Sequence, residues 1–128
     1  MAKTSTKLSK KVGLAPGTLL HIGAKKSDYI KITAIDYTAT DYNEILCNTP
    51  QDFFPLKTSP TTSWINVDGL HNTKIIEEIG NYFELHPLLM EDILNTNHRP
   101  KMEEFDNYVF VTLKMLGISK SGHSIISE

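Results

Sequence analysis

The sequence predicts an α/β fold in which a mixed β-sheet of about five to seven strands packs with α-helices. Polar and apolar residues alternate from residue 29 to 37, which is typical of a strand with one buried face. Apolar residues recur at helical spacing from residue 75 to 83, which predicts an amphipathic helix. The 128 residues, of which 40% are apolar and 22% charged, are enough for one globular domain with a real core.

The first half of the chain is predicted to consist mainly of short strands. The clearest of them is residues 29–37. Ile30, Ile32 and Ala34 share one face of it, because successive side chains of a strand point to opposite sides. Trp64 begins a further short strand that reads as buried, since packing is a commoner role for tryptophan than stacking on a nucleotide. The other elements expected here are strands at 18–22 and 44–47 and one helical turn at 51–54 that ends at Pro55.

Two helices are predicted in the second half. Asn72 or Thr73 can cap the first helix by accepting a hydrogen bond from a backbone N–H. Pro87 suits the first turn of a second, shorter helix, where its missing N–H costs little. The run from Tyr108 to Leu116 reads as a central strand, apolar on both faces. The remaining elements expected are strands at 101–105 and 124–128, with turns at 106–107 and 117–122.

Charge separates the beginning of the chain from the rest. Four lysines make residues 1–11 a basic leader, which we expect to be flexible and solvated. A weak contact with anionic lipid or a neighbouring subunit is the alternative. The whole chain has thirteen basic and fifteen acidic residues, so residues 12–128, which we expect to form a single domain, are distinctly acidic. An acidic surface excludes nucleic acid as a partner and suits the attraction of hard cations.

Several classes of protein are excluded by what the sequence lacks. Cys47 is the single cysteine, so neither an internal disulfide nor a thiolate zinc cluster can form. Without a signal peptide or eighteen consecutive apolar residues, the chain taken alone reads as cytoplasmic. Neither a phosphate-cradling glycine loop nor a G-x-S-x-G elbow occurs, so we expect no enzyme. His71, His86 and His98 match no compact zinc motif, and His86 is expected to make a local turn contact.

Two adjacent carboxylates, Glu91 and Asp92, lie inside an otherwise apolar helical segment. Neighbouring residues of a helix point about 100° apart, so the two side chains cannot both face the core. They can chelate one ion only with further ligands, because Mg²⁺ takes six oxygens and keeps its waters. The pair therefore makes a weak half-site for a divalent cation. The alternative is that both acids are simply solvated.

Four sequence blocks occur in one order. They are W-I-N-V-D-G-L at 64–70, H-P-L-L-M-E-D-I-L-N at 86–95, R-P-K at 99–101 and the apolar Y-V-F-V at 108–111. In this order and spacing they resemble the soluble N-terminal domain of the CorA family of magnesium and cobalt transporters. Weaker similarity extends back to residues 13–18, so the resemblance covers most of the chain.

The resemblance implies a fold and a function. The soluble domain of that family is an α/β sandwich at the cytoplasmic face of the cell membrane, followed by a stalk helix and two membrane helices in a homopentamer. By position, Asp92 corresponds to the principal sensor carboxylate for Mg²⁺, and Glu91 to an auxiliary ligand; Co²⁺ is a further possible ion. We therefore expect a cation-sensing regulatory domain whose membrane region and partner carboxylate lie outside this chain. The alternatives are a zinc-transporting relative and a free-standing assembly module without metal sensing.

Overall fold

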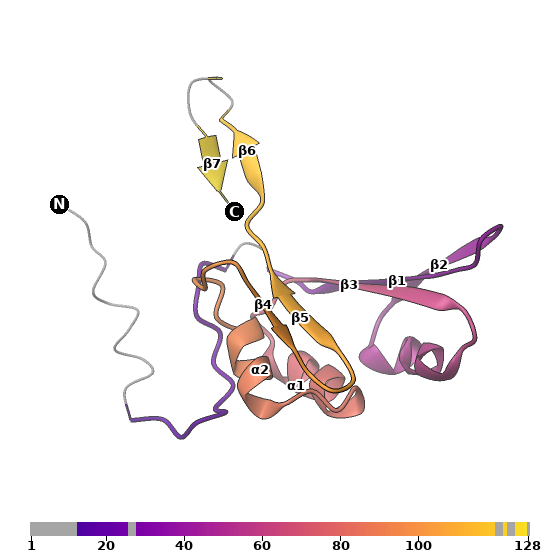
Figure 1. Ribbon diagram of the computed structural model, residues 1–128, viewed down its shortest axis with the longest axis horizontal. Helices are drawn as coiled ribbons and strands as arrows, with labels where there is room; N and C mark the ends of the chain where they lie inside the picture. Colours follow the sequence, from indigo (N-terminus) through magenta and orange to yellow (C-terminus); the bar gives the residue numbers. More distant parts are fainter. Residues whose placement is uncertain (1–12, 26–27, 120–121, 123–124, 128) are drawn as a thin grey trace. The chain divides into compact units, whose positions relative to one another are not determined.

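The computed structural model describes residues 13–25, 28–119, 122 and 125–127. The chain divides into two compact units, Met1–Thr96 and Asn97–Glu128 (Figure 1). The described residues form seven strands and two α-helices, which confirms the predicted α/β class. The strands belong to three small antiparallel sheets, whereas the sequence predicts one mixed sheet. The predicted basic leader, residues 1–11, lies outside the described residues.

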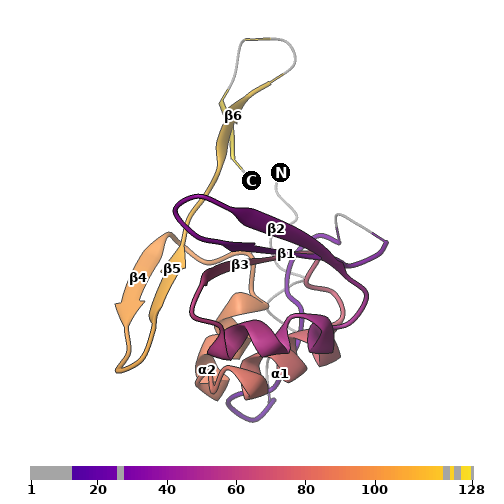
Figure 2. The ribbon, with the colours of Figure 1, turned by 90° about the vertical axis from the view of Figure 1, so that its right-hand side faces the viewer.

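The first unit is built on a three-stranded sheet with strand order β2-β1-β3. The strands are β1 (Lys31–Tyr37), β2 (Tyr42–Cys47) and β3 (Thr62–Asp68). Ala34 of the central strand lies opposite Ile45 on one side and Ile65 on the other. Because directly opposed residues of antiparallel strands share a face, these three apolar side chains form one surface. Helical segments of the same unit cover that surface (Figure 2).

Phe53 is at the centre of the core that lies beneath the sheet. Its side chain is 0% exposed, and its ring packs edge-to-face against Phe54 and stacks on Phe83. Phe53 joins two 3-10 turns, η2 (Pro50–Asp52) and η3 (Phe54–Thr58). The prediction that Pro55 ends a single turn is therefore wrong. Pro55 lies in the first turn of η3, where a missing N–H is tolerated.

The predicted burial of Trp64 is also wrong. Its side chain is 64% exposed, because Trp64 lies opposite Ile35 on the outer face of the sheet. Successive residues of a strand point to opposite sides, so β3 can bury either Trp64 or its neighbours Ile65 and Val67. The two aliphatic neighbours pack against the core cluster, and Trp64 faces outward.

Of the predicted strand 18–22, Ile22 alone takes part in a pairing, an isolated bridge.

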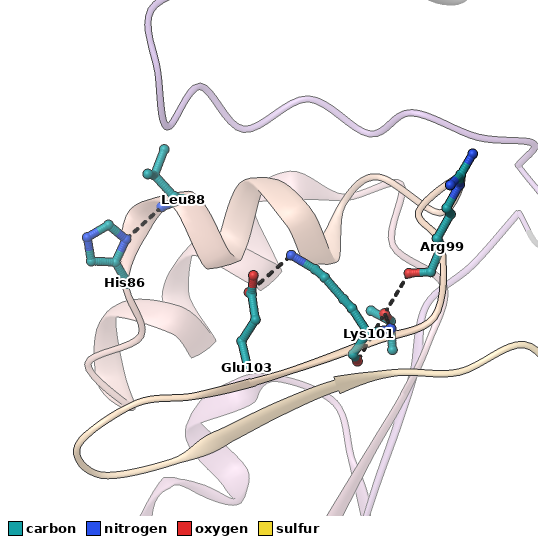
Figure 3. Close-up of polar contacts among 6 residues, drawn as sticks. His86, Leu88, Arg99, Lys101 and Glu103 are labelled. Atoms are coloured by element: carbon teal, nitrogen blue, oxygen red, sulfur yellow. Dashed lines mark hydrogen bonds and ion pairs between the residues drawn. The ribbon is translucent and has the colours of Figure 1, made fainter.

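Both helices of the first unit start as predicted. Helix α1 (Thr73–Tyr82) has Asn72 as its N-cap, and the Asn72 side chain accepts a hydrogen bond from the Lys74 N–H at 3.2 Å. Helix α2 (Pro87–Ile93) has Pro87 in its first turn. Its N-cap is His86, whose Nδ1 accepts from the Leu88 N–H at 3.2 Å (Figure 3). The expected local contact of His86 is therefore confirmed as a helix cap.

The two helices approach each other closely at Gly80 and Met90. Both residues are buried. A Cβ atom placed on Gly80 would lie 1.9 Å from Sδ of Met90, far inside van der Waals contact. The glycine therefore lowers helix propensity in α1 but permits the close contact with α2.

The second unit consists of two hairpins. Strands β4 (Lys101–Glu104) and β5 (Val109–Thr112) form the first, and β6 (Leu116–Ile118) and β7 (Ile125–Ser127) form the second. The predicted turn at residues 106–107 is confirmed and is closed by the Phe105 N–H, which donates to the Tyr108 carbonyl at 2.9 Å.

The predicted central strand 108–116 is wrong. Residues 113–115 interrupt it, and its two parts pair with different partners. Val109 and Val111 are exposed because the hairpin brings no second layer of its own over that face. On the other face of the hairpin, the Lys101 ammonium lies 3.0 Å from the Glu103 carboxylate (Figure 3).

Neither helix within the described residues is long and apolar enough to cross a membrane.

Candidate functional site

The carboxylates of Glu91 and Asp92 lie on the outer side of α2. Leu89 and Met90 are buried, whereas Glu91 and Asp92 are half-buried. Successive residues of a helix are about 100° apart, so the side chains of Glu91 and Asp92 project on either side of Leu88, which lies one turn earlier in the helix. Leu88 is 49% exposed, so this side of the helix faces outward. The structure thus places both predicted residues half-buried on one side of α2 and splays their side chains apart.

Glu91 has a partner that the sequence does not reveal. Its Oε2 accepts a hydrogen bond from the backbone N–H of Gly17 at 2.8 Å, across 74 residues of sequence. Gly17 belongs to a turn closed by Thr18, whose N–H donates to the Ala15 carbonyl at 3.2 Å. The Pro16-Gly17 pair signals this turn, because glycine accepts the positive φ of +82° found there. No local sequence pattern identifies Glu91 as the carboxylate that accepts a hydrogen bond from this turn.

The histidines that the structure describes do not gather into a metal site. Among the residues that the structure describes, no group of three or more histidine, cysteine, aspartate or glutamate side chains is placed to hold an ion. His86 is engaged as the cap of α2. Burial, and then the nearby charge of His71, lower the pKa of His21. A His21 side chain in that environment stays neutral to lower pH than an exposed histidine does.

The donor chemistry of the carboxylate pair fits a hard divalent cation, but the number of donors is small. Carboxylate oxygens are the ligands that Mg²⁺ prefers, and Mg²⁺ demands about six oxygens in an octahedron. Within the described part of the chain, Glu91 and Asp92 are not joined by a third clustered ligand. They would therefore hold such an ion together with waters and further oxygen ligands.

Three other acidic residues and a hollow of the first unit are not part of the carboxylate pair. Glu103, Glu104 and Asp106 are exposed on the β4-β5 hairpin, as expected for a solvated edge. A hollow of about 540 Å³ at the start of α1 is lined by residues that include Tyr29 and His71. Neither member of the carboxylate pair lines that hollow.

Comparison with known proteins gives two matches. The model of the family described as CorA-like Mg²⁺ transporter protein matches residues 60–125. The chain is also 40% identical over 122 residues to the cobalt/magnesium transport protein CorA of Thermotoga maritima. That alignment covers 95% of this chain and 34% of the relative, so the chain spans about a third of the relative's length.

Proposed function

Because this chain belongs to the CorA-like Mg²⁺ transporter family, we propose that it is the cytoplasmic regulatory domain of a transporter for magnesium and cobalt. In this proposal residues 12–128 are part of one domain that senses divalent cations and does not itself conduct them. The conducting part would lie in membrane segments outside the 128 residues. The relative from Thermotoga maritima, named as a cobalt/magnesium transport protein, supports the choice of ions.

The observation that carries the proposal is the carboxylate pair on the outer side of α2. We assign Asp92 as the principal ligand of the regulatory ion and Glu91 as the auxiliary ligand. Both are half-buried on a helix whose opposite side packs in the first unit. Such a position ties the carboxylates to a packed helix while keeping part of each side chain exposed to solvent. The missing ligands would come from that subunit in a homopentamer.

Charge repulsion supplies the switching energy. Two carboxylates from neighbouring subunits, a few ångströms apart, repel each other by roughly 1–4 kcal/mol, depending on the local dielectric. A bound divalent cation supplies the neutralising charge. When the site empties, Asp92 and its partner carboxylate push the subunits apart. Several equivalent interfaces acting together can then shift a closed-to-open equilibrium.

The proposal is tested with Asp92→Asn in the full-length protein. The substitution keeps the shape of the side chain and removes its charge. We expect the Mg²⁺ concentration that gives half-maximal protection from proteolysis to rise about ten-fold, which corresponds to about 1.4 kcal/mol of binding free energy. Glu77→Gln, which removes an exposed charge from α1, is the matched control and should leave the concentration unchanged. An Asp92→Asn protein that is protected like the wild type would refute the assignment.

Two further observations bear on the same proposal. Calorimetry on the 128-residue chain should detect only weak Mg²⁺ binding, because half of the ligands are proposed to lie elsewhere; a submillimolar site within one chain would contradict this. We also expect the reading frame of the source gene to continue past Glu128 into a long helix and two apolar spans. A stop codon directly after Glu128 would favour a free-standing assembly module instead.

A further inference from the structure

Residues 17–22, here called the strap, are hydrogen-bonded to α2 and the residues that follow it at both ends of the strap. At the first end, the Gly17 N–H donates to Glu91 Oε2 at 2.8 Å. At the other end, the Ile22 N–H donates to the Leu94 carbonyl at 2.9 Å. The Ile22 carbonyl accepts from the Thr96 N–H at 3.0 Å. The strap is therefore fixed by a side-chain contact at its first end and by a short stretch of backbone pairing at the other.

Close packing accompanies these hydrogen bonds. A Cβ atom on Gly17 would lie 3.5 Å from the Cβ of Pro87, at the start of α2. A Cβ atom on Gly23 would lie 2.0 Å from Oγ1 of Thr96 and 3.3 Å from its Cβ. Thr96 Oγ1 itself donates to the Ile22 carbonyl at 3.1 Å. A side chain at residue 23 would therefore displace the hydroxyl that holds the end of the strap.

From this geometry we propose that the strap positions the carboxylate pair, with Gly17 as the positioning residue. The inference rests on the proposed function. It adds a supporting role for Gly17, which is not itself an ion ligand in that proposal. The Gly17 N–H fixes the orientation of the Glu91 carboxylate, because a hydrogen bond to a charged acceptor is short and directional. α2 has seven residues, too few to be stable alone. The strap therefore also steadies the helix that carries Asp92.

The general reason to expect an effect on ion binding is the role of supporting hydrogen bonds at metal sites. Carboxylates that ligate metals are themselves hydrogen-bonded, and loss of such a partner typically weakens the metal affinity about 10- to 100-fold. Loosening the strap should therefore weaken cation binding although both carboxylates remain. A role as a mere structural tie would change folding stability and leave the Mg²⁺ dependence as it is.

The first experiment compares Glu91→Ala with Glu91→Gln in the full-length protein. Glutamine keeps an oxygen that can accept from the Gly17 N–H, and alanine does not. Hydrogen exchange of the Gly17 amide should accelerate on the order of ten-fold in Glu91→Ala and clearly less in Glu91→Gln. Both variants should need more Mg²⁺ for protection from proteolysis, because both lose the charge. Equal exchange of the Gly17 amide in wild type and Glu91→Ala would overturn the inference.

The second experiment releases the other end of the strap without touching a carboxylate. Gly23→Ala forces Thr96 Oγ1 away from the Ile22 carbonyl and strains a residue whose φ is +152°. We expect faster exchange of the Ile22 amide and a Mg²⁺ midpoint raised about ten-fold. Gly122→Ala is the matched control, because Gly122 also has a positive φ, +71°, and has nothing within 4 Å of the added Cβ.

The two proposals fail in different ways. If Asp92→Asn raises the Mg²⁺ midpoint but Gly23→Ala does not, the strap has no positioning role and the sensing function stands. If Gly23→Ala leaves the Ile22 amide as protected as in the wild type, the strap is not held as described and the inference is again overturned. If Asp92→Asn leaves the midpoint unchanged, the proposed function is refuted, and the inference that rests on it is refuted too.

Discussion

The β2-β1-β3 sheet and the β4-β5 hairpin differ in how far their apolar side chains are exposed. In the sheet, Ile32 and Ala34 are 2% and 0% exposed, because the 3-10 turns and α1 cover them. In the hairpin, Met102 and Val109 share one face and are 72% and 56% exposed. Both regions place apolar side chains together on one face of a sheet, so an apolar face alone does not ensure burial. Burial requires a second layer. Among the residues that the structure describes, the sheet of the first unit has such a layer from helical segments of its own unit, and the hairpin of the second unit does not.

The largest expected effect comes from removing the centre of the covered layer. Phe53→Ala should lower the free energy of unfolding by about 3–5 kcal/mol, because it empties a fully buried site between two aromatic rings. Urea denaturation measures the difference. Met102→Ala, on the open face of the hairpin, should change the free energy by less than about 0.5 kcal/mol. Similar losses in the two variants would abolish the distinction between the regions.

The close contact between the helices should be nearly as sensitive. Gly80→Ala adds a methyl group against Met90 and should destabilise by about 1–3 kcal/mol, although alanine is the better helix former. Combined with Met90→Ala, which makes room, the two changes should cost less than the sum of the single changes. Strict additivity in a double-mutant cycle would show that the helices do not meet there.

A pH-dependent effect is expected at η2. The Asp52 carboxylate accepts hydrogen bonds from the Thr49 and Asn48 N–H groups at 3.0 and 2.8 Å, and these lower the pKa of Asp52. A carboxyl whose pKa is lower in the folded state stabilises the fold above its unfolded pKa and loses that stabilisation as the pH falls through the folded value. Asp52→Asn should therefore lower Tm at neutral pH, and the difference should vanish in strong acid. A Tm difference that persists in acid would assign the effect to shape, not charge.

The smallest effect is expected on the outer face of the sheet. Trp64→Thr should change the free energy of unfolding by no more than about 0.5 kcal/mol, whereas Ile65→Ala on the inner face should cost clearly more. Because Trp64 is the single tryptophan, its fluorescence reports that face directly. Acrylamide should quench it efficiently in the folded chain. A shielded, blue-shifted emission would mean that the outer face is covered.

The features predictable from the sequence are those set by local chemistry. Asn72 and Pro87 mark the starts of the two helices because caps and missing N–H groups act within one turn. The side on which Trp64 lies could not be predicted, since β3 carries apolar side chains on both faces and the covering layer comes from residues 50–58 and from α1. The candidate carboxylates were found as a pair, but the bond of Glu91 to Gly17 joins residues too distant for any local pattern.

Because Met90 packs tightly against Gly80, the rate at which Met90 is oxidised reports how often α1 and α2 open locally. A thioether must meet an oxidant to become a sulfoxide, and Met90 is 6% exposed whereas Met115 is 68% exposed. Peroxide should therefore oxidise Met115 at the rate of a free methionine, and Met90 only as often as α1 and α2 separate. The ratio of the two rates, read by mass spectrometry, measures how frequently the helix that carries Glu91 and Asp92 leaves its place.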